Sequence, residues 1–172
     1  NCYDVSYIRT TSVEAIFPVI DNIRFRHFNK KVYKIENIKM KNILITGGAG
    51  FIGSRLCEKL HNKGYHITIL DNLSEQIHGK EESSLFKKIK GKCTFIKGDV
   101  RNKEDWKIAI KGQDIIVHLA AETGTGQSMY EVEKYNEVNI MGTAHMLELL
   151  SNTNHSVKKM IVASSRAIYG EG

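Results

Sequence analysis

The stretch Ile43–Ser54, which reads ILITGGAGFIGS, decides the fold of this 172-residue chain. An apolar, β-branched strand, expected over Asn42–Thr46, runs into spaced glycines and then directly into an amphipathic helix, expected over Phe51–Lys63. A pyrophosphate group can approach a backbone closely only where side chains are absent. The free amides at a helix N-terminus supply donors and a partial positive charge. The stretch therefore predicts a cradle for the pyrophosphate of a nucleotide.

The glycines of this turn have separate tasks. Gly47 and Gly48 make the turn itself. Gly50 permits close approach of the ligand, and Gly53 lets helix and strand pack closely. A glycine turn alone is a weak signal, but here it follows a strand and opens a helix, which is the context expected of a dinucleotide-binding turn.

Asp71 completes this pattern. It ends a second expected strand, His66–Leu70, roughly 20 residues beyond the glycines, where a carboxylate can accept hydrogen bonds from both hydroxyls of an adenosine ribose. The alternative is a tight turn followed by a solvated acid, and the joint occurrence of strand, glycines, helix and acid disfavours it. A carboxylate here would repel the additional phosphate of NADP, and the glycine turn contains no arginine, so the sequence favours NAD.

Composition indicates one globular domain. Hydrophobic residues make up 41% and charged residues 26% of the chain. The net charge of +6 is spread evenly, because residues 1–40 hold seven Lys/Arg against four acids and the remainder holds eighteen against fifteen. Without an arginine-rich or aromatic-interleaved stripe, we expect no nucleic-acid partner.

The cysteines and the hydropathy pattern bear on the cellular compartment of the protein and on whether it associates with a membrane. Cys2, Cys57 and Cys93 are odd in number and lack metal-ligand spacing, which suits a reducing compartment, and we expect the cytoplasm. The sequence contains no apolar stretch of membrane-spanning length and does not open with a signal sequence, so we expect no membrane partner.

The N-terminal segment differs from the rest. Residues 1–40 lack a sustained hydrophobic period, whereas Met40-Lys41 resembles a natural start. We expect residues 1–40 to be an unassigned extension, with a short strand or helix around Val13–Ile20, and residues 41–172 to form the nucleotide-binding domain. The alternative is that the extension is the tail of a preceding domain.

From residue 41 onward, strands and helices alternate. Such alternation implies parallel βαβ units and therefore an α/β fold with a doubly wound parallel sheet of the Rossmann type, truncated after its fifth strand. The polar segment Ser74–Lys92 is expected to be a loop with a short helix. The expected strands are residues 42–46, 66–70, 93–97, 114–119 and 158–164.

Taken together, the strand ends resemble the extended short-chain dehydrogenase/reductase family over residues 41–172, and specifically its NAD-dependent nucleotide-sugar epimerases and dehydratases. The resemblance implies NAD as cofactor, contacted by the glycine turn, by the ends of the following strands and by the helix expected over Val132–Ser151. The cofactor-binding residues that it implies are Gly47, Gly50, Phe51, Ile52, Gly53, Asp71, Asn72, Asp99, Val100, Leu119, Ala120, Ala121, Asn139 and Ser164.

Two of the polar residues at strand ends have alternative interpretations. Asp99, which the resemblance places at the adenine, could instead cap the helix expected over Lys103–Lys111. His118, on the fourth strand, is interpreted as a packing residue, because an isolated histidine on a buried strand is more often a satisfied core group than a catalyst. None of the seven histidines has metal-ligand spacing, so no metal site is expected.

Ser165 is the expected catalytic residue. It follows the fifth strand and matches the catalytic serine or threonine of the family, which hydrogen-bonds the sugar oxygen being oxidised and helps to position a tyrosine base. A serine at a strand end can instead simply cap the next turn.

The tyrosine base of the family belongs to a Tyr-x-x-x-Lys pair, in which the lysine charge lowers the phenol pKa. The resemblance places that pair beyond Gly172. Tyr130 and Lys134 have the right spacing, but they precede Ser165, and the two glutamates between them would oppose a lower phenol pKa. We therefore expect these 172 residues to be the cofactor portion of an enzyme, to bind NAD weakly or not at all, and not to turn over sugar.

The residues after Ser165 help to distinguish an epimerase from a dehydratase. Family dehydratases carry an Asp-Glu pair there, whereas this chain has Arg166-Ala167. The resemblance thus favours an epimerase, of the dTDP-rhamnose 4-epimerase group, in which hydride is removed from and returned to the sugar C4. It implies a nucleotide-diphosphate sugar as substrate and a homodimer for the full-length protein. The alternatives are a nucleotide-sugar dehydratase or decarboxylase, and a non-catalytic NAD-binding module.

Overall fold

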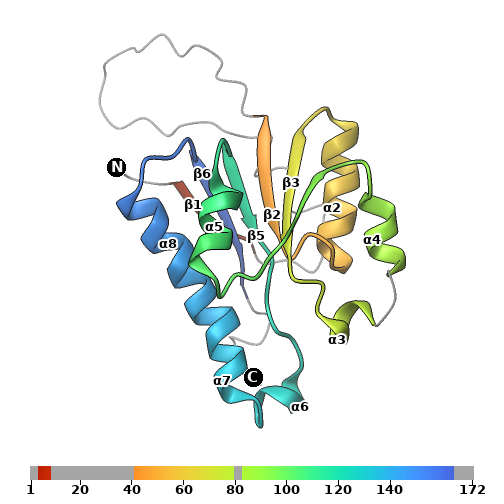
Figure 1. Cartoon of the computed structure of the whole chain (residues 1–172), viewed down its shortest axis with the longest axis vertical. Coiled ribbons are helices and arrows are strands. Elements are labelled where there is room, and N and C mark those ends of the chain that lie inside the picture. Colours follow the sequence, from red (N-terminus) through yellow and green to blue (C-terminus); the bar gives the residue numbers. More distant parts are fainter. Residues whose placement is uncertain (1–3, 9–40, 80–82, 165–172) are drawn as a thin grey trace.

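The computed structural model describes residues 4–8, 41–79 and 83–164, and it has an α/β architecture (Figure 1). In this part of the chain, six strands form one sheet in which every pair is parallel, in the order β1-β6-β5-β2-β3-β4. The strands are β1 (Asp4–Ile8), β2 (Asn42–Thr46), β3 (His66–Asp71), β4 (Thr94–Lys97), β5 (Ile115–His118) and β6 (Lys159–Ala163).

The doubly wound sheet predicted from residue 41 onward is confirmed. The five predicted strands lie in the order β4-β3-β2-β5-β6, with ends that differ from the expected ones by one residue at most. The strand order reverses between β2 and β5. In such sheets, ligands bind in the crevice outside the carboxyl ends of the strands at this switch point.

Strand β1 was not predicted. It pairs in parallel with β6, from Asp4 opposite Lys159 to Ile8 opposite Ala163, and thereby forms the edge of the sheet. This is the place of the sixth strand in a six-stranded Rossmann sheet. The N-terminal extension thus adds to the sheet that was expected to end at its fifth strand. The element expected around Val13–Ile20 lies outside the described residues.

The helices cover both faces of the sheet (Figure 1). Two helices, α3 and α4, occur where one short helix was expected after Ser74, and the helix expected over Val132–Ser151 contains a π-helical turn, η2, in its middle and ends at Asn152. The helical elements are α2 (Phe51–Asn62), α3 (Glu75–His78), α4 (Ser84–Ile89), α5 (Lys103–Ile110), α6 (Thr125–Ser128), α7 (Val132–Asn136), η2 (Glu137–Met141) and α8 (Gly142–Asn152).

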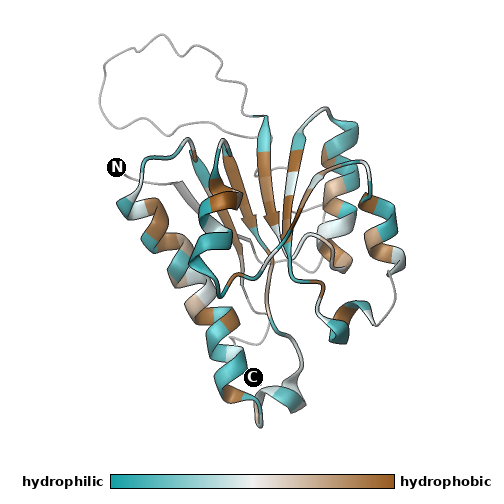
Figure 2. Cartoon of the chain, viewed as in Figure 1, coloured by the Kyte–Doolittle hydropathy of each residue, from teal (hydrophilic) through white to brown (hydrophobic). Residues whose placement is uncertain are grey.

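Successive side chains of the central strand β2 point to opposite faces of the sheet. Two hydrophobic cores result, one on each face. Ile43 and Ile45 of β2 pack with α2 and α4, whereas Leu44 between them packs with α5 and α8. All three side chains are fully buried. The central strand β2 is mostly apolar, while the helices alternate between apolar and hydrophilic residues (Figure 2).

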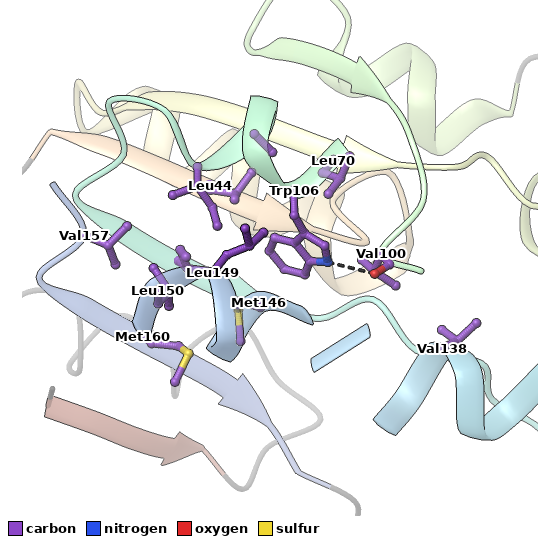
Figure 3. Close-up of a cluster of buried hydrophobic side chains, with 13 residues drawn as sticks. Leu44, Leu70, Val100, Trp106, Val138, Met146, Leu149, Leu150, Val157 and Met160 are labelled. Carbon is purple, nitrogen blue, oxygen red and sulfur yellow. Dashed lines mark hydrogen bonds between the residues drawn. The ribbon is translucent and has the colours of Figure 1, made fainter. Parts of the chain in front are cut away.

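Trp106 is the largest side chain of the core on the α5 side (Figure 3). Its indole Nε1 donates a hydrogen bond of 2.8 Å to the carbonyl oxygen of Val100. Because buried indole nitrogens need an acceptor, this bond both satisfies the ring and fixes the loop that follows β4 against α5. Among the described residues, no helix is both long and apolar enough to cross a membrane.

Candidate functional site

The glycine turn is packed between its neighbours without room for side chains. Gly47 has a φ of +65°, and a Cβ atom there would lie 2.8 Å from the backbone of Ala120. Its amide donates to the carbonyl oxygen of Leu70 at 2.9 Å. Gly47 therefore holds the turn at the switch point, against the ends of β3 and β5.

The start of α2 faces the cleft with bare backbone. A Cβ at Gly53 would lie 2.5 Å from both the carbonyl oxygen of Gly47 and the Cα of Gly48, so the helix rests directly on the turn. Gly50 is the N-cap and has no side chain with which to bind the first amides, and the first turn of α2 carries no acid. Unpaired amides at a helix N-terminus form a site for an anion.

Asp71 lies beside this turn, as the sequence predicts. The residue is 8% exposed, and its Oδ2 accepts a hydrogen bond of 2.9 Å from the amide of Ala49, inside the glycine turn. Its Oδ1 accepts from the amide of Leu73, also at 2.9 Å. These bonds fix the carboxylate at the end of β3, and each oxygen keeps a free lone pair for a further donor.

His78 is a site residue that sequence reasoning missed. It belongs to α3, and its Nε2 lies 3.7 Å from Oδ1 of Asp71, with the imidazole only 5% exposed. Its Nδ1 lies 2.9 Å from Oγ of Ser83, which also accepts a hydrogen bond from the amide of Phe86 and caps α4. His78 thus connects the carboxylate of Asp71 to the start of α4. A single histidine in a polar segment offers no signal that would have separated it from a surface residue.

These elements enclose a cleft of about 370 Å³ at the carboxyl ends of β2, β3 and β5. Its wall includes His78 and every predicted cofactor-binding residue except Asn139 and Ser164. The predicted residues that line it are Gly47, Gly50, Phe51, Ile52, Gly53, Asp71, Asn72, Asp99, Val100, Leu119, Ala120 and Ala121.

The two other predicted cofactor-binding residues lie outside the cleft wall. The side chain of Asn139 in η2 accepts from the amide of Glu122 at 2.8 Å and donates to its carbonyl at 3.1 Å. Asn139 therefore holds the loop that follows β5, whose residue Glu122 does line the cleft. Ser164 is exposed and follows Ala163, which also lines the cleft. The expected catalytic Ser165 lies outside the described residues.

The sequence model of the NAD dependent epimerase/dehydratase family matches residues 43–172. The chain belongs to this family. It is 37% identical over 134 residues to dTDP-L-rhamnose 4-epimerase from Burkholderia thailandensis, which covers 77% of this chain and 36% of that protein. It is 37% identical over 131 residues to UDP-glucose 4-epimerase from Bacillus subtilis, which covers 74% of this chain and 38% of that one.

Solved structures of epimerases share this fold. A UDP-glucose-4-epimerase from Stenotrophomonas maltophila, with bound NAD and formylated UDP-arabinopyranose, aligns with a TM-score of 0.65 at 26% identity, covering 77% of this chain and 39% of that chain. UDP-glucose 4-epimerase from Thermotoga maritima aligns with a TM-score of 0.63 at 31% identity, covering 76% and 40%. This member of the family thus spans about two fifths of the length of these relatives.

Asp99 does not cap α5 in this family member. Asn102 is the N-cap, with its side-chain oxygen accepting from the amide of Glu104 at 3.0 Å. Asp99 instead binds the guanidinium of Arg101 at 2.8 Å and accepts from the side chain of Asn72 at 3.1 Å. Burial alone would raise the pKa of Asp99, but the hydrogen bonds from Arg101 and Asn72 outweigh it and lower this pKa to about 2. The carboxylate of Asp99 is therefore ionised and paired with Arg101 at this side of the cleft.

His118 is a core residue, as predicted. The residue is 4% exposed, its Nδ1 lies 2.6 Å from Oγ1 of Thr46, and its Nε2 lies 3.0 Å from Oγ1 of Thr143. The ring also contacts Trp106, with centroids 5.5 Å apart. Burial lowers the pKa of His118 to about 4, so the imidazole is neutral at neutral pH.

Tyr130 and Lys134 do not form the combination of tyrosine base and neighbouring lysine that the family uses. Tyr130 is 86% exposed. The ammonium of Lys134 lies 2.9 Å from the carboxylate of Glu131 and 3.5 Å from that of Glu122. The lysine charge is thus engaged by acids, as the intervening glutamates led us to expect. Within the described residues, no group of His, Cys, Asp or Glu could hold a metal ion.

Proposed function

We propose that the cleft binds NAD, with the pyrophosphate on the glycine turn and the adenosine ribose on Asp71. The observation that carries this proposal is the 2.9 Å hydrogen bond from the Ala49 amide to Asp71, which fixes the ribose-binding acid to the turn that would hold the phosphates. The bare start of α2 at Gly50 supplies the donors and the partial charge that a diphosphate requires.

The same carboxylate makes NAD the preferred cofactor over NADP. A phosphate on the ribose 2′-oxygen would stand beside the negative charge of Asp71, which is 8% exposed and so is poorly screened by water. The guanidinium of Arg101 beside Asp99 is already engaged by Asp99 at 2.8 Å and by Glu137 at 3.3 Å. No arginine lines the cleft among the described residues.

For the whole protein, we propose nucleotide-sugar epimerisation at C4. When bound, NAD supplies a reversible hydride acceptor at that carbon. Ser165, two residues beyond the end of β6, is proposed to hydrogen-bond the sugar oxygen, and the loop held by Asn139 would border the sugar. The relatives named above are 4-epimerases of dTDP- and UDP-sugars, which supports a nucleotide-diphosphate sugar as substrate.

Calorimetric titration of the chain with NAD tests the cofactor proposal. We expect weak binding, and we expect Asp71→Asn to weaken it at least about tenfold because the ribose loses a charged acceptor. The matched control is Asp114→Asn, since Asp114 also accepts two backbone amides, from Lys41 at 3.0 Å and Asn42 at 2.9 Å, but at the opposite end of β2. Equal loss in both variants, or NADP binding as tightly as NAD, would overturn the proposal.

The sugar chemistry is tested separately on the whole protein, by NMR of UDP-glucose and a dTDP-6-deoxyhexose incubated with its NAD-loaded form. Line broadening of the sugar signals supports substrate binding, and a C4 epimer supports the reaction directly. A 4-keto-6-deoxy product would instead establish a dehydratase, and binding of NAD without any response from either sugar would favour a cofactor-binding module.

We also propose a homodimer for the whole protein, through the helical segment that follows β5. Large apolar side chains project into solvent along this segment: Val132 is 55%, Ile140 59%, Met141 47% and Leu147 44% exposed. Exposed apolar residues grouped on one helix mark an interaction surface. Sedimentation velocity should show a dimer that Ile140→Lys converts to monomer, and a wild-type monomer at every concentration would contradict this.

A further inference from the structure

Cys57 and Cys93 form a thiol pair that the proposed cofactor site does not use. Cys57 lies on α2 and is fully buried, whereas Cys93 lies between α4 and β4 and is partly exposed. Cys57 belongs to the core between α2 and the sheet, and Cys93 packs against the same core. The pKa of each thiol depends on the other.

The neighbouring residues hold the two segments together. The ammonium of Lys92 lies 2.6 Å from the carboxylate of Glu58, so the residue beside each cysteine pairs with the residue beside the other. Helices α2 and α4 also contact each other on this face of the sheet (Figure 1). The two segments that carry the cysteines are therefore held together by the Lys92–Glu58 ion pair and by the contact between α2 and α4.

The two thiols differ in character. The hydrogen bond from Cys57 lowers the pKa of Cys93, while the same bond and burial raise the pKa of Cys57. The thiol of Cys93 can also bond the carbonyl oxygen of Ile89, at 3.5 Å. A partly exposed thiol whose pKa is lowered, beside a second, buried thiol, is the arrangement found in peroxide-sensitive cysteine pairs.

We propose that Cys57 and Cys93 are a site of reversible oxidation, at which a peroxide converts the two thiols into a disulfide between α2 and the start of β4. The thiolate of Cys93 attacks one peroxide oxygen, so that an S–O bond forms, the O–O bond breaks, and hydroxide leaves. Cys93 is then a sulfenic acid. The sulfur of Cys57 attacks that of Cys93, the S–S bond forms, the S–O bond breaks, and the hydroxide leaves as water with the proton of Cys57.

In total, two thiols supply two electrons, the peroxide is reduced to two waters, and one disulfide remains. A cellular dithiol reverses the reaction by exchange. The disulfide would tie α2, whose first turn borders the cleft, to the strand that precedes Asp99. This proposal does not depend on the identity of the ligand in that cleft.

Peptide mapping of the full chain after treatment with hydrogen peroxide tests the proposal. Trypsin releases Cys57 in the peptide Leu56–Lys59 and Cys93 in the peptide Cys93–Lys97. We expect these two peptides to appear joined, with a mass 2 Da below the sum of the free peptides, and to separate again on reduction with dithiothreitol. Cys2→Ser, the matched control, should leave the joined product unchanged.

Two further measurements keep the assignment of roles testable. Cys57→Ser should accumulate a sulfenic acid at Cys93 that dimedone traps, and iodoacetamide should label Cys93 at least about tenfold faster than Cys57 in the untreated wild-type chain. Oxidation that stops at Cys93 in the wild type, or a disulfide formed only with Cys2, would overturn the proposal. Unchanged thiols at peroxide concentrations that oxidise free cysteine would overturn it as well.

Discussion

At the scale of single residues, the sequence predicted much of the lining of the cleft, because backbone sterics dictate where glycine must stand. Gly47 has a left-handed φ of +65°, which favours glycine. A Cβ added at Gly53 would lie only 2.5 Å from backbone atoms of the turn. Asp71 could be predicted for a similar reason, since its position at the end of β3 follows from strand length. His78 could not, because its contact with Asp71 depends on how α3 packs, and α3 has only four residues.

Replacement of Gly53 by alanine tests the sterics of the turn. We expect Gly53→Ala to lower the free energy of unfolding by about 2 to 3 kcal/mol, because the added methyl group meets backbone atoms that cannot move aside. Gly126→Ala is the matched control, since a Cβ at Gly126 meets no atom within 4 Å. Urea denaturation measures both variants, and equal stability would show that α2 does not rest on the turn as described.

His78 offers a second test at this scale. We expect His78→Ala to weaken NAD binding about threefold to tenfold, because the imidazole wall beside Asp71 is lost and the carboxylate becomes more solvated. His61→Ala, on the exposed side of α2, should bind NAD as the wild type does. Calorimetry decides, and an unchanged affinity in His78→Ala would remove this residue from the site.

At the scale of helices and strands, the periodicity of hydrophobic residues predicted the long elements but not the short ones. The strands and α2 carry clear patterns, so their ends were predicted closely. By contrast, α3 and α4 have four and six residues, which is too short for a period to be visible. The π-helical turn η2 could not be predicted either, since it depends on tertiary contacts such as the bonds of Asn139 to the backbone of Glu122.

The junction of β2, β5 and α8 at His118 makes stability depend on pH. The pKa of His118 is lowered by burial from 6.5 to about 4 in the folded chain. Between these values the unfolded chain binds a proton that the folded chain does not, so stability is fully present above pH 6.5 and falls as pH drops toward 4. The full effect is about 3 kcal/mol.

Urea denaturation across this range measures the effect. We expect His118→Gln to show a flatter dependence of the free energy of unfolding on pH between 6.5 and 4 than the wild type. The variant His66→Gln, at an exposed position on β3, should keep the wild-type dependence. Parallel curves for the wild type and His118→Gln would contradict the buried, neutral state of this imidazole.

At the scale of the whole molecule, β1 joins the two ends of the described chain at one edge of the sheet. Sequence reasoning predicted no strand there, because residues 1–40 have no hydrophobic period and β1 gains its partner only when β6 has formed. The side of β6 that would otherwise be open is paired by β1, which becomes the edge strand in its place.

Removal of residues 1–8 tests this role. We expect the shortened chain to exchange the backbone amides of Met160–Val162 faster by hydrogen–deuterium exchange, because these residues lie opposite Val5–Tyr7 in the parallel pair. Unchanged protection of β6 would mean that its edge does not rely on β1.

The proposed role of the glycine turn and Asp71 together is to hold the ADP half of NAD. The most direct measurement is a ¹H–¹⁵N NMR titration of the ¹⁵N-labelled chain with NAD and, for comparison, with ADP-ribose. We predict that both ligands shift the amide signals of Gly50–Gly53 and of Asp71–Leu73, with little change at Asp114 on the opposite edge of the sheet. Shifts confined to other residues, or no shifts at millimolar ligand, would contradict it.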